Sequence, residues 1–200
     1  MIGIKHQFIF VHIPKTAGNT LQSILSPYSE DSIVASSNKD GIHRFGLSSA
    51  YGTTKHATLS EYFSALGAQL FWSMKKFTCI RNPWERAISF YFSPHRGHRI
   101  WDRNTFVQEL DKIQSMVSFL QLSNEGNPDK NLNFIIRYEQ LNQDFCRLCN
   151  DLGFEKKNLP ILNKGNRQPY VSYYDSGLIQ MVADRFAADI KLFGYEFSSQ

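Results

Sequence analysis

The sequence predicts an α/β fold in which helices flank a central, mainly parallel β-sheet. Short apolar segments bounded by turn residues alternate with segments of helical periodicity, which is the order that βαβ units produce. The strand segments are continuously apolar, as buried parallel strands are. In sheets of this class, ligands bind beyond the carboxyl ends of the strands, and the chemically informative residues of this chain follow those ends.

Three apolar segments are the expected strands, and helical patterns lie between and after them. The strands are Phe8–Ile13, Phe77–Arg81 and Asn133–Glu139. The expected helices begin at Thr20, cover 58–67 and 83–92, form one or two helices over 101–122, and cover 141–153 and 174–194. Thr58 and Glu61 form a capping box, Pro83 suits a first helical turn, and Gly67 is an expected stop. The polar stretches 27–57 and 155–174 are expected to be irregular.

Length and composition fit one domain over residues 1–200 and suit an anionic small ligand. Of 200 residues, 42% are hydrophobic and 20% charged, and the net charge of +4 is too small to indicate nucleic acid. No apolar run suits a transmembrane helix and no signal-peptide core is visible, so we expect a cytoplasmic protein. Cys146 and Cys149 form a C-x-x-C pair with no second pair nearby, which favours a structural role over metal or redox chemistry.

A phosphate-binding loop is predicted directly after the first strand, in the segment FIFVHIPKTAGNT (8–20). Backbone N–H groups at the start of the following helix carry partial positive charge and point outward, so they attract an anion. Lys15 adds a full charge, and Gly18 permits a close approach of the backbone. Thr16 and Thr20 supply hydroxyl groups. A strand-turn-helix with a solvated lysine is the alternative interpretation of this segment.

A second anion site is predicted in CIRNPWERAISFYF (79–92). Arg81 ends the second strand, and Ser89 follows eight positions later on the next helix. An arginine offers a rigid fork of donors that matches a phosphate, and a serine adds one hydroxyl. Either residue alone would fit a surface ion pair or a solvent-facing position. The two segments together make a functional interpretation stronger than these alternatives.

These two segments resemble the motifs of the sulfotransferase family, enzymes that use 3'-phosphoadenosine 5'-phosphosulfate (PAPS). PKTAGNT resembles the family's 5'-phosphosulfate loop, and RNPWERAISFY resembles its 3'-phosphate motif. The likeness is closest to the carbohydrate-type branch, of which this chain would be a bacterial-like soluble member. RYEQLNQDF, LPILNKGNRQPYVSYYD and DIKLFGYEF resemble later segments of that branch. The resemblance implies a P-loop-like α/β fold and a reaction that needs no metal.

The resemblance also implies roles for individual residues. Lys15 matches the lysine that stabilises the departing phosphate, and Arg81 and Ser89 would hold the 3'-phosphate. A late basic loop folds over the nucleotide in this family, which makes Lys164 and Arg167 further candidates. The residues expected at the 5' end are Lys15, Thr16, Ala17, Gly18, Asn19 and Thr20. The acceptor would be a small molecule or a saccharide, and the branch favours a carbohydrate.

His56 is the residue we expect to act as the base. Histidine titrates near neutral pH, and TTKHATLSEYF places His56 just before a helix, where the family carries its base. His43 is the second candidate, and a capping or structural role is the alternative for His56. A carboxylate such as Glu61 or Glu85 is the chemical alternative. His12 lies inside the first strand, where we expect a packed residue.

The segment SPHRGHRIWDRN (93–104) has two interpretations. Its arginines at positions 96, 99 and 103, together with Trp101, would bind an acidic or sugar acceptor. Alternatively, the segment is an exposed loop that the tryptophan anchors.

Two other classes of function remain open from the residues. A P-loop kinase needs a Gly-Lys-Ser/Thr ending and an acidic metal-holding residue, but here Lys15 precedes Gly18. A non-catalytic module that binds an anionic nucleotide or glycan would keep Arg81 and Ser89 and would need neither Lys15 nor a base.

Overall fold

The computed structural model describes residues 1–34, 45–122, 127–155, 159 and 167–198. The strands are β1 (Ile2–Gly3), β2 (Phe8–Val11), β3 (Ser32–Val34), β4 (Gly46–Ser48), β5 (Lys75–Ile80) and β6 (Phe134–Arg137). The α-helices are α1 (Gly18–Leu25), α2 (Leu59–Ser73), α3 (Pro83–Tyr91), α4 (Arg103–Leu110), α5 (Leu141–Leu152), α6 (Ser176–Arg185) and α7 (Ala187–Phe193). The 3-10 helices are η1 (Ser26–Tyr28), η2 (Pro94–Arg96), η3 (Val117–Phe119), η4 (Pro128–Asn131), η5 (Tyr138–Gln140) and η6 (Tyr170–Tyr173).

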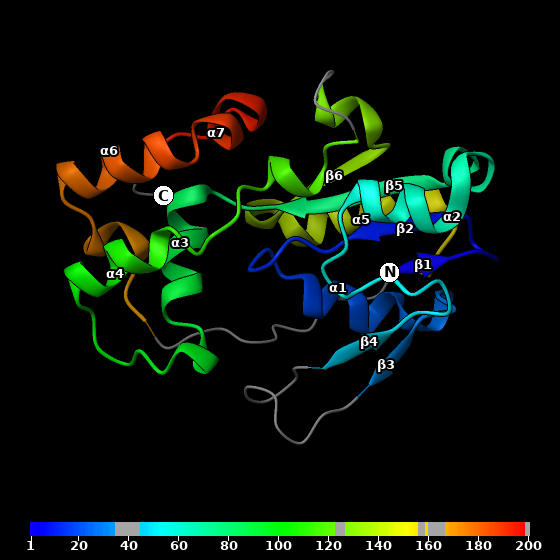
Figure 1. Ribbon diagram of the computed structural model, residues 1–200, viewed down its shortest axis with the longest axis horizontal. Coiled ribbons are helices and arrows are strands. Elements are labelled where there is room, and N and C mark those ends of the chain that lie inside the picture. The colour runs from blue at the N-terminus through cyan, green and yellow to red at the C-terminus, as the bar shows by residue number, and fades with distance from the viewer. Residues whose placement is uncertain (35–44, 123–126, 156–158, 160–166, 199–200) are drawn as a thin grey trace.

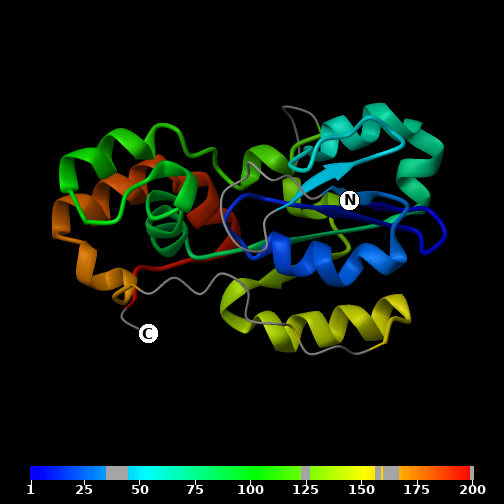
Figure 2. The ribbon, with the colours of Figure 1, turned by 90° about the horizontal axis from the view of Figure 1, so that it is seen from below.

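A four-stranded sheet in the order β1-β2-β5-β6 forms the centre of the fold. Strands β2, β5 and β6 run parallel, and β1 pairs antiparallel with β2 at the edge. Helices lie on both faces: α2 covers one, and α1 with α5 covers the other (Figure 1, Figure 2). The predicted α/β class with a mainly parallel central sheet is therefore confirmed.

Strand β2 shows how the sheet buries both of its faces. Successive side chains of a strand point to opposite faces. Phe8 and Phe10 pack into an apolar cluster with residues of α1 and α5, while Ile9 and Val11 join a second cluster with residues of α2. All four side chains are buried, which is why this segment is continuously apolar in sequence.

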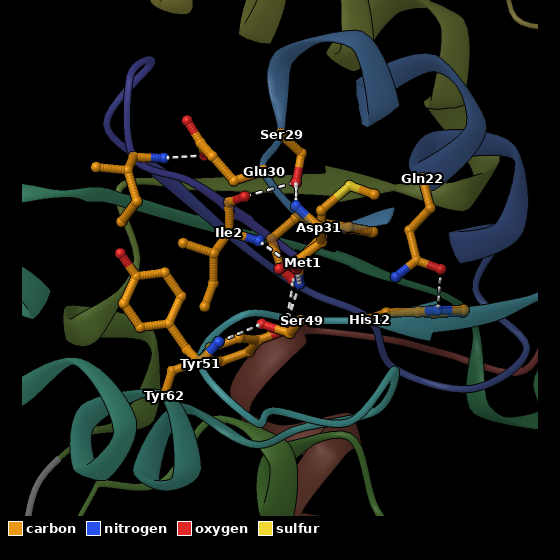
Figure 3. A network of polar contacts seen from close by, with 12 residues as sticks. Met1, Ile2, His12, Gln22, Ser29, Glu30, Asp31, Ser49, Tyr51 and Tyr62 are labelled. Atoms are coloured by element: carbon orange, nitrogen blue, oxygen red, sulfur yellow. Dashed lines mark hydrogen bonds and ion pairs between the residues drawn. The ribbon is translucent and has the colours of Figure 1, made fainter. Parts of the chain in front are cut away.

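The three predicted strands are present as β2, β5 and β6, with ends that differ by a few residues. Strand β1 was not predicted, because it has only two residues. It is held in place by Asp31, whose Oδ2 accepts a hydrogen bond from the backbone N–H of Ile2 at 2.8 Å (Figure 3). Strands β3 and β4 form a separate antiparallel pair inside the stretch expected to be irregular. Each has three partly exposed residues, so no apolar run marks them.

Helix α2 begins at the predicted capping box and ends later than predicted. The hydroxyl of Thr58 accepts from the Glu61 N–H, and the Glu61 carboxylate accepts from the Thr58 N–H. Gly67 does leave the helical conformation, with φ 71° and ψ 160°, but the helix resumes and continues to Ser73. Phe71 in the second half is buried in the core, so packing sustains the helix beyond the glycine.

The carboxyl-terminal half contains shorter helices than the sequence predicted. The 101–122 stretch holds α4 and η3, and the 174–194 stretch is divided into α6 and α7 at Phe186, whose φ is −114° and ψ is 28°. Gly153 and Gly194 end α5 and α7 in the left-handed conformation, as predicted for helix stops.

Helices α3, α4, α6 and α7 gather beyond one end of the sheet (Figure 1). The chain enters this group through α3, which directly follows β5, so the second predicted motif lies where the two parts of the fold meet. Among the described residues, no helix has the length and apolar character needed to cross a membrane.

Candidate active site

A cavity of about 740 Å³ lies where three parallel strands end. Lys15 comes shortly after β2, and Arg81 and Tyr138 come directly after β5 and β6; all three line the cavity. Ile80 and Arg137 are register partners, so Arg81 and Tyr138 leave neighbouring strands at the same level. The volume is in the range of small-molecule sites, and the position is the sheet edge at which α/β proteins bind ligands.

Most of the predicted site residues line this cavity. They are Lys15, Ala17, Gly18, Asn19, Thr20, His56, Arg81 and Ser89. The side chain of Thr16 is buried, and its hydroxyl donates to the carbonyl of Ile13 at 2.8 Å, so this hydroxyl is directed into the protein. Arg167 reaches the edge of the site through an ion pair with Glu85. Lys164 and the second base candidate, His43, lie outside the described residues.

The loop between β2 and α1 has a backbone shape that suits an anion. Lys15 has φ 71° and Ala17 has φ 66°, so two non-glycine residues adopt the left-handed conformation on either side of Thr16. Each such residue costs about 1–2 kcal/mol, which the surrounding contacts have to offset. Successive N–H groups converge in such a loop and form a concave anion site. Ala17 caps α1 without a side-chain hydrogen bond, which leaves the N–H groups of the first turn available to a ligand.

Gly18 lies against the imidazole of His12. A Cβ at Gly18 would be 1.8 Å from His12 Cδ2 and 2.0 Å from Nε2, so only glycine fits here. His12 is 3% exposed, and its Nδ1 is 3.0 Å from Gln22 Oε1 (Figure 3). Burial, followed by the charges of His56 and Lys55, lowers the pKa of His12 well below its usual value. The ring is therefore neutral at neutral pH, and it supports the loop from beneath.

Lys15 projects from this loop toward α3. Its Nζ donates a hydrogen bond to Ser93 Oγ at 2.7 Å, and both residues line the cavity. Ser93 follows the end of α3 and is buried. The lysine charge is thereby held at the cavity wall, next to the helix that carries Ser89.

Arg81 is 5% exposed and has partners on three sides. One terminal nitrogen donates to the Lys15 carbonyl at 3.1 Å, and the other donates to Glu85 Oε1 at 2.7 Å. The guanidinium carbon lies 3.7 Å from the centre of the Tyr138 ring, a cation–π contact. Arg167 lies 3.7 Å from the same Glu85 oxygen, and burial and then the Arg81 charge lower the pKa of Arg167. Two arginines thus share one carboxylate at this end of the site.

His56 lines the cavity beside His12, with the two ring centroids 4.4 Å apart, and the backbone fixes its tautomer. Its Nδ1 is 2.9 Å from the carbonyl oxygen of His12. A carbonyl only accepts, so Nδ1 carries the proton and Nε2 of the neutral ring keeps its lone pair. Although solvent reaches the side chain from the cavity, the surrounding protein lowers the pKa of His56 by desolvation. The bond to the His12 carbonyl raises this pKa and the Lys55 charge lowers it, and the net result is a pKa below the usual value.

The charge of the cavity wall is positive. Lys15, Lys55 and Arg81 line it, and none of the described residues in the wall is acidic. A concave site with cations of one sign concentrates anions. The arrangement fits the anionic small ligand that the overall charge predicted.

Some cavity residues were missed by sequence reasoning. The sequence contained a signal for Tyr138, because it lies near the carboxyl end of the predicted strand Asn133–Glu139, as Arg81 lies at the end of the predicted strand Phe77–Arg81. Phe45, Leu47, Thr53 and Lys55 come from the stretch expected to be irregular, where no pattern distinguishes a wall residue from a loop residue.

Trp101 occupies an aromatic cluster. Its ring centroid is 4.9 Å from Phe106, 5.0 Å from Tyr173 and 5.2 Å from Tyr91. Arg96 pairs with Glu109 and Arg103 pairs with Asp175, so these two arginines of the 93–104 segment already have carboxylate partners.

A search of curated proteins found no match to this chain. Among solved structures, the chain is similar to a crystal structure of a sulfotransferase from Alicyclobacillus acidocaldarius, with 14% sequence identity and a TM-score of 0.41. That match covers 70% of this chain and 61% of the other, so it spans less than two thirds of the other chain's length. The family model "Sulfotransferase family" matches residues 1–196, and the chain belongs to this family.

Proposed function

We propose that this chain transfers a sulfuryl group from PAPS to a hydroxyl or amine of an acceptor. The observation that carries the proposal is the cavity that Lys15, His56 and Arg81 line together from three separate segments. Family membership supports sulfuryl transfer in general. The resemblance of PKTAGNT and RNPWERAISFY to the donor motifs of the carbohydrate-type branch supports PAPS as the donor and a carbohydrate as the acceptor.

The donor has an anionic group at each end, and the cavity offers a cationic region for each. Backbone N–H groups of the loop from Thr16 to Thr20, with Lys15, would hold the 5'-phosphosulfate. Arg81 and Ser89 would hold the 3'-phosphate. Arg167 adds charge beside Arg81 through the shared Glu85, and Lys164 remains a candidate from the same late segment.

In the transfer step, the acceptor oxygen forms a bond to sulfur while the bond from sulfur to the phosphate oxygen breaks. The electron pair stays on the phosphate oxygen, and Lys15 would stabilise the negative charge that develops there. The acceptor proton would pass to Nε2 of His56. Positioning and charge stabilisation supply most of the catalysis in transfers of this kind.

His56 fits the role of base because its tautomer and its protonation state both suit it. The bond from Nδ1 to the His12 carbonyl leaves the Nε2 lone pair free to accept a proton. The lowered pKa of His56 keeps the ring neutral at neutral pH, so the base is present in its active form.

A transfer assay with sulfur-labelled PAPS tests the proposal. The purified chain is incubated with a panel of saccharides and small hydroxyl and amine compounds, and labelled products are identified by mass. Lys15→Ala should lower turnover about 100- to 1,000-fold, because an oriented charge at the leaving group is lost. Affinity for adenosine 3',5'-bisphosphate should fall much less, since several backbone groups and Arg81 remain.

Lys75→Ala is the matched control, because Lys75 pairs with Asp151 at the start of β5, away from the carboxyl ends of the strands. This variant should keep normal turnover. Tight binding of the nucleotide without transfer to any acceptor would favour the non-catalytic binding module. Absence of nucleotide binding in the unmodified chain would reject the proposal altogether.

A further inference from the structure

Arg86 is a buried charge that the proposed reaction does not use. It lies in α3, is 2% exposed, and is the largest fully buried side chain among the described residues. Burial lowers the pKa of Arg86 to about 10, an effect that the Asp189 carboxylate opposes and the Arg81 charge reinforces. The side chain is therefore still charged at neutral pH. A guanidinium is costly to bury, so its interactions need an explanation.

Arg86 forms a hydrogen bond with the loop between β2 and α1, residues 12–17, which we call the anion loop. Its Nε donates a hydrogen bond to the carbonyl of Pro14 at 3.0 Å, across 72 positions of sequence. Arg81 donates to the next carbonyl along the chain, that of Lys15, at 3.1 Å. Two arginines of the RNPWER segment therefore hold two consecutive carbonyls of the loop after β2.

This pair of contacts determines which way the loop amides point. In a trans peptide the carbonyl and the following N–H point in opposite directions. With the carbonyls of Pro14 and Lys15 turned toward the arginines, the N–H groups of Lys15 and Thr16 turn away from them. The left-handed conformation of Lys15, with φ 71°, belongs to this arrangement and is unfavourable without such contacts.

We infer that Arg86 is a positioning residue for the anion loop: by fixing the Pro14 carbonyl, it orients the loop amides toward the 5' group of the donor. The inference rests on the proposed function and adds to it a residue that never touches the ligand. It makes a specific claim about ligand recognition, because Arg86 acts on the 5' end of the nucleotide and has no part in holding the 3' end.

Two nucleotides that differ only at the 5' end separate this role from a general structural one. The affinities of the full chain for adenosine 3',5'-bisphosphate and adenosine 3'-phosphate are measured by titration calorimetry, before and after Arg86→Met. The variant should lose about tenfold or more in affinity for the bisphosphate, the typical effect of one charge-assisted hydrogen bond. Its affinity for the 3'-phosphate should stay within about twofold, since the loop amides do not contact that ligand.

Arg185→Met is the matched control. Arg185 also donates to backbone carbonyls, those of Asp111 at 3.1 Å and Ile113 at 3.3 Å, and it lies at the end of α6 outside the cavity wall. This variant loses the same kind of contact and should leave both affinities unchanged. Arg86→Lys keeps the charge and a long stem but lacks the guanidinium fork. It should lose bisphosphate affinity by an intermediate factor, and it carries the test if Arg86→Met does not fold.

The outcomes are distinct for the two proposals. An equal loss for both nucleotides, or no loss in a folded Arg86 variant, would overturn the positioning role while leaving the proposed function intact. Failure of the unmodified chain to bind either nucleotide would overturn the proposed function and the inference that rests on it. Selective loss of bisphosphate affinity in the Arg86 variants, with Arg185→Met unchanged, is the expected result.

Discussion

Replacing Gly18 with alanine should destabilise the chain and disturb the anion loop, because the added methyl group has no space. The Cβ would lie 1.8 Å from His12 Cδ2, whereas real Cβ contacts essentially never fall below 3.0 Å. His12 cannot swing aside easily, since its ring is buried, bonded to Gln22 and stacked on Phe10 with centroids 6.1 Å apart. The loop or the ring must therefore shift.

Two effects of opposite sign determine the magnitude for Gly18→Ala. Overpacking a well-packed region costs about 1–3 kcal/mol, and the size of this overlap places the cost near the upper end. Alanine is a better helix former than glycine by up to about 1 kcal/mol, and less than that at the first helical position. We therefore expect a net loss of about 2 kcal/mol in the free energy of unfolding.

Urea denaturation followed by tryptophan fluorescence measures this loss, and Gly46→Ala is the matched control. A Cβ at Gly46 meets its nearest atom, the Val34 carbonyl oxygen, at 3.6 Å, which is an ordinary contact. Its effect should stay within about 0.5 kcal/mol. Combining Gly18→Ala with His12→Ala should cost about 1–2 kcal/mol less than the sum of the single changes, because the clash disappears. If Gly18→Ala is as stable as the unmodified chain and binds nucleotide normally, the loop does not rest on His12.

His56 should determine how kcat/KM depends on pH, and His12 should affect how the stability of the fold depends on pH. Because the pKa of His56 is lowered, the acid limb of the kcat/KM profile should have its midpoint below about 6.5, the ordinary histidine value. A midpoint above this value would contradict the proposal that His56 is a neutral base at neutral pH. For His12, the unfolded chain binds a proton near pH 6.5 and the folded chain does not, so stability falls as pH falls. Between pH 7.5 and 5.5 this loss is about 1.4 kcal/mol while the buried ring stays neutral. Equilibrium unfolding at both pH values should show this loss in the unmodified chain. In His12→Gln the total loss should be smaller by about 1.4 kcal/mol, and the part due to the lowered pKa of His56 should remain.

The fold was predictable from sequence because its main signals are local. Strand β2 buries both faces and is therefore apolar at every position, and this continuous apolar run is visible in the sequence. The capping box at Thr58 and Glu61 satisfies backbone groups within one helical turn, and it is present as predicted. Gly67 shows the limit of such local signals. The glycine breaks the helical geometry, but burial of Phe71 further along keeps the chain helical to Ser73.

The candidate site was predictable in its location, whereas its internal contacts were not. The rule that parallel strands end at one edge places Lys15 and Arg81 close together, and it applies equally to Tyr138. Lys15 contacts Ser93 across 78 positions, and His56 contacts the His12 carbonyl across 44. Contacts of this length depend on how loops pack against one another, and no periodicity or spacing in the sequence encodes them.

The arginines of RNPWER show why a motif can be recognised before its physical role is understood. The sequence suggested that Arg81 binds phosphate directly, and it does line the cavity, but it also holds the Lys15 carbonyl of the other motif. Losing Arg81 would therefore remove a proposed ligand donor and a contact to the loop that presents Lys15, and the two effects would combine in one measured affinity. Among the described residues, Ser89 forms no side-chain hydrogen bond with the loop, so its substitution tests the proposed 3'-phosphate contact more cleanly. Likewise, Arg86 contacts the loop without lining the cavity, so its substitution tests the backbone shape of the proposed 5' site alone. The two motifs are thus one structural unit, in which side chains of the second determine the backbone shape of the first.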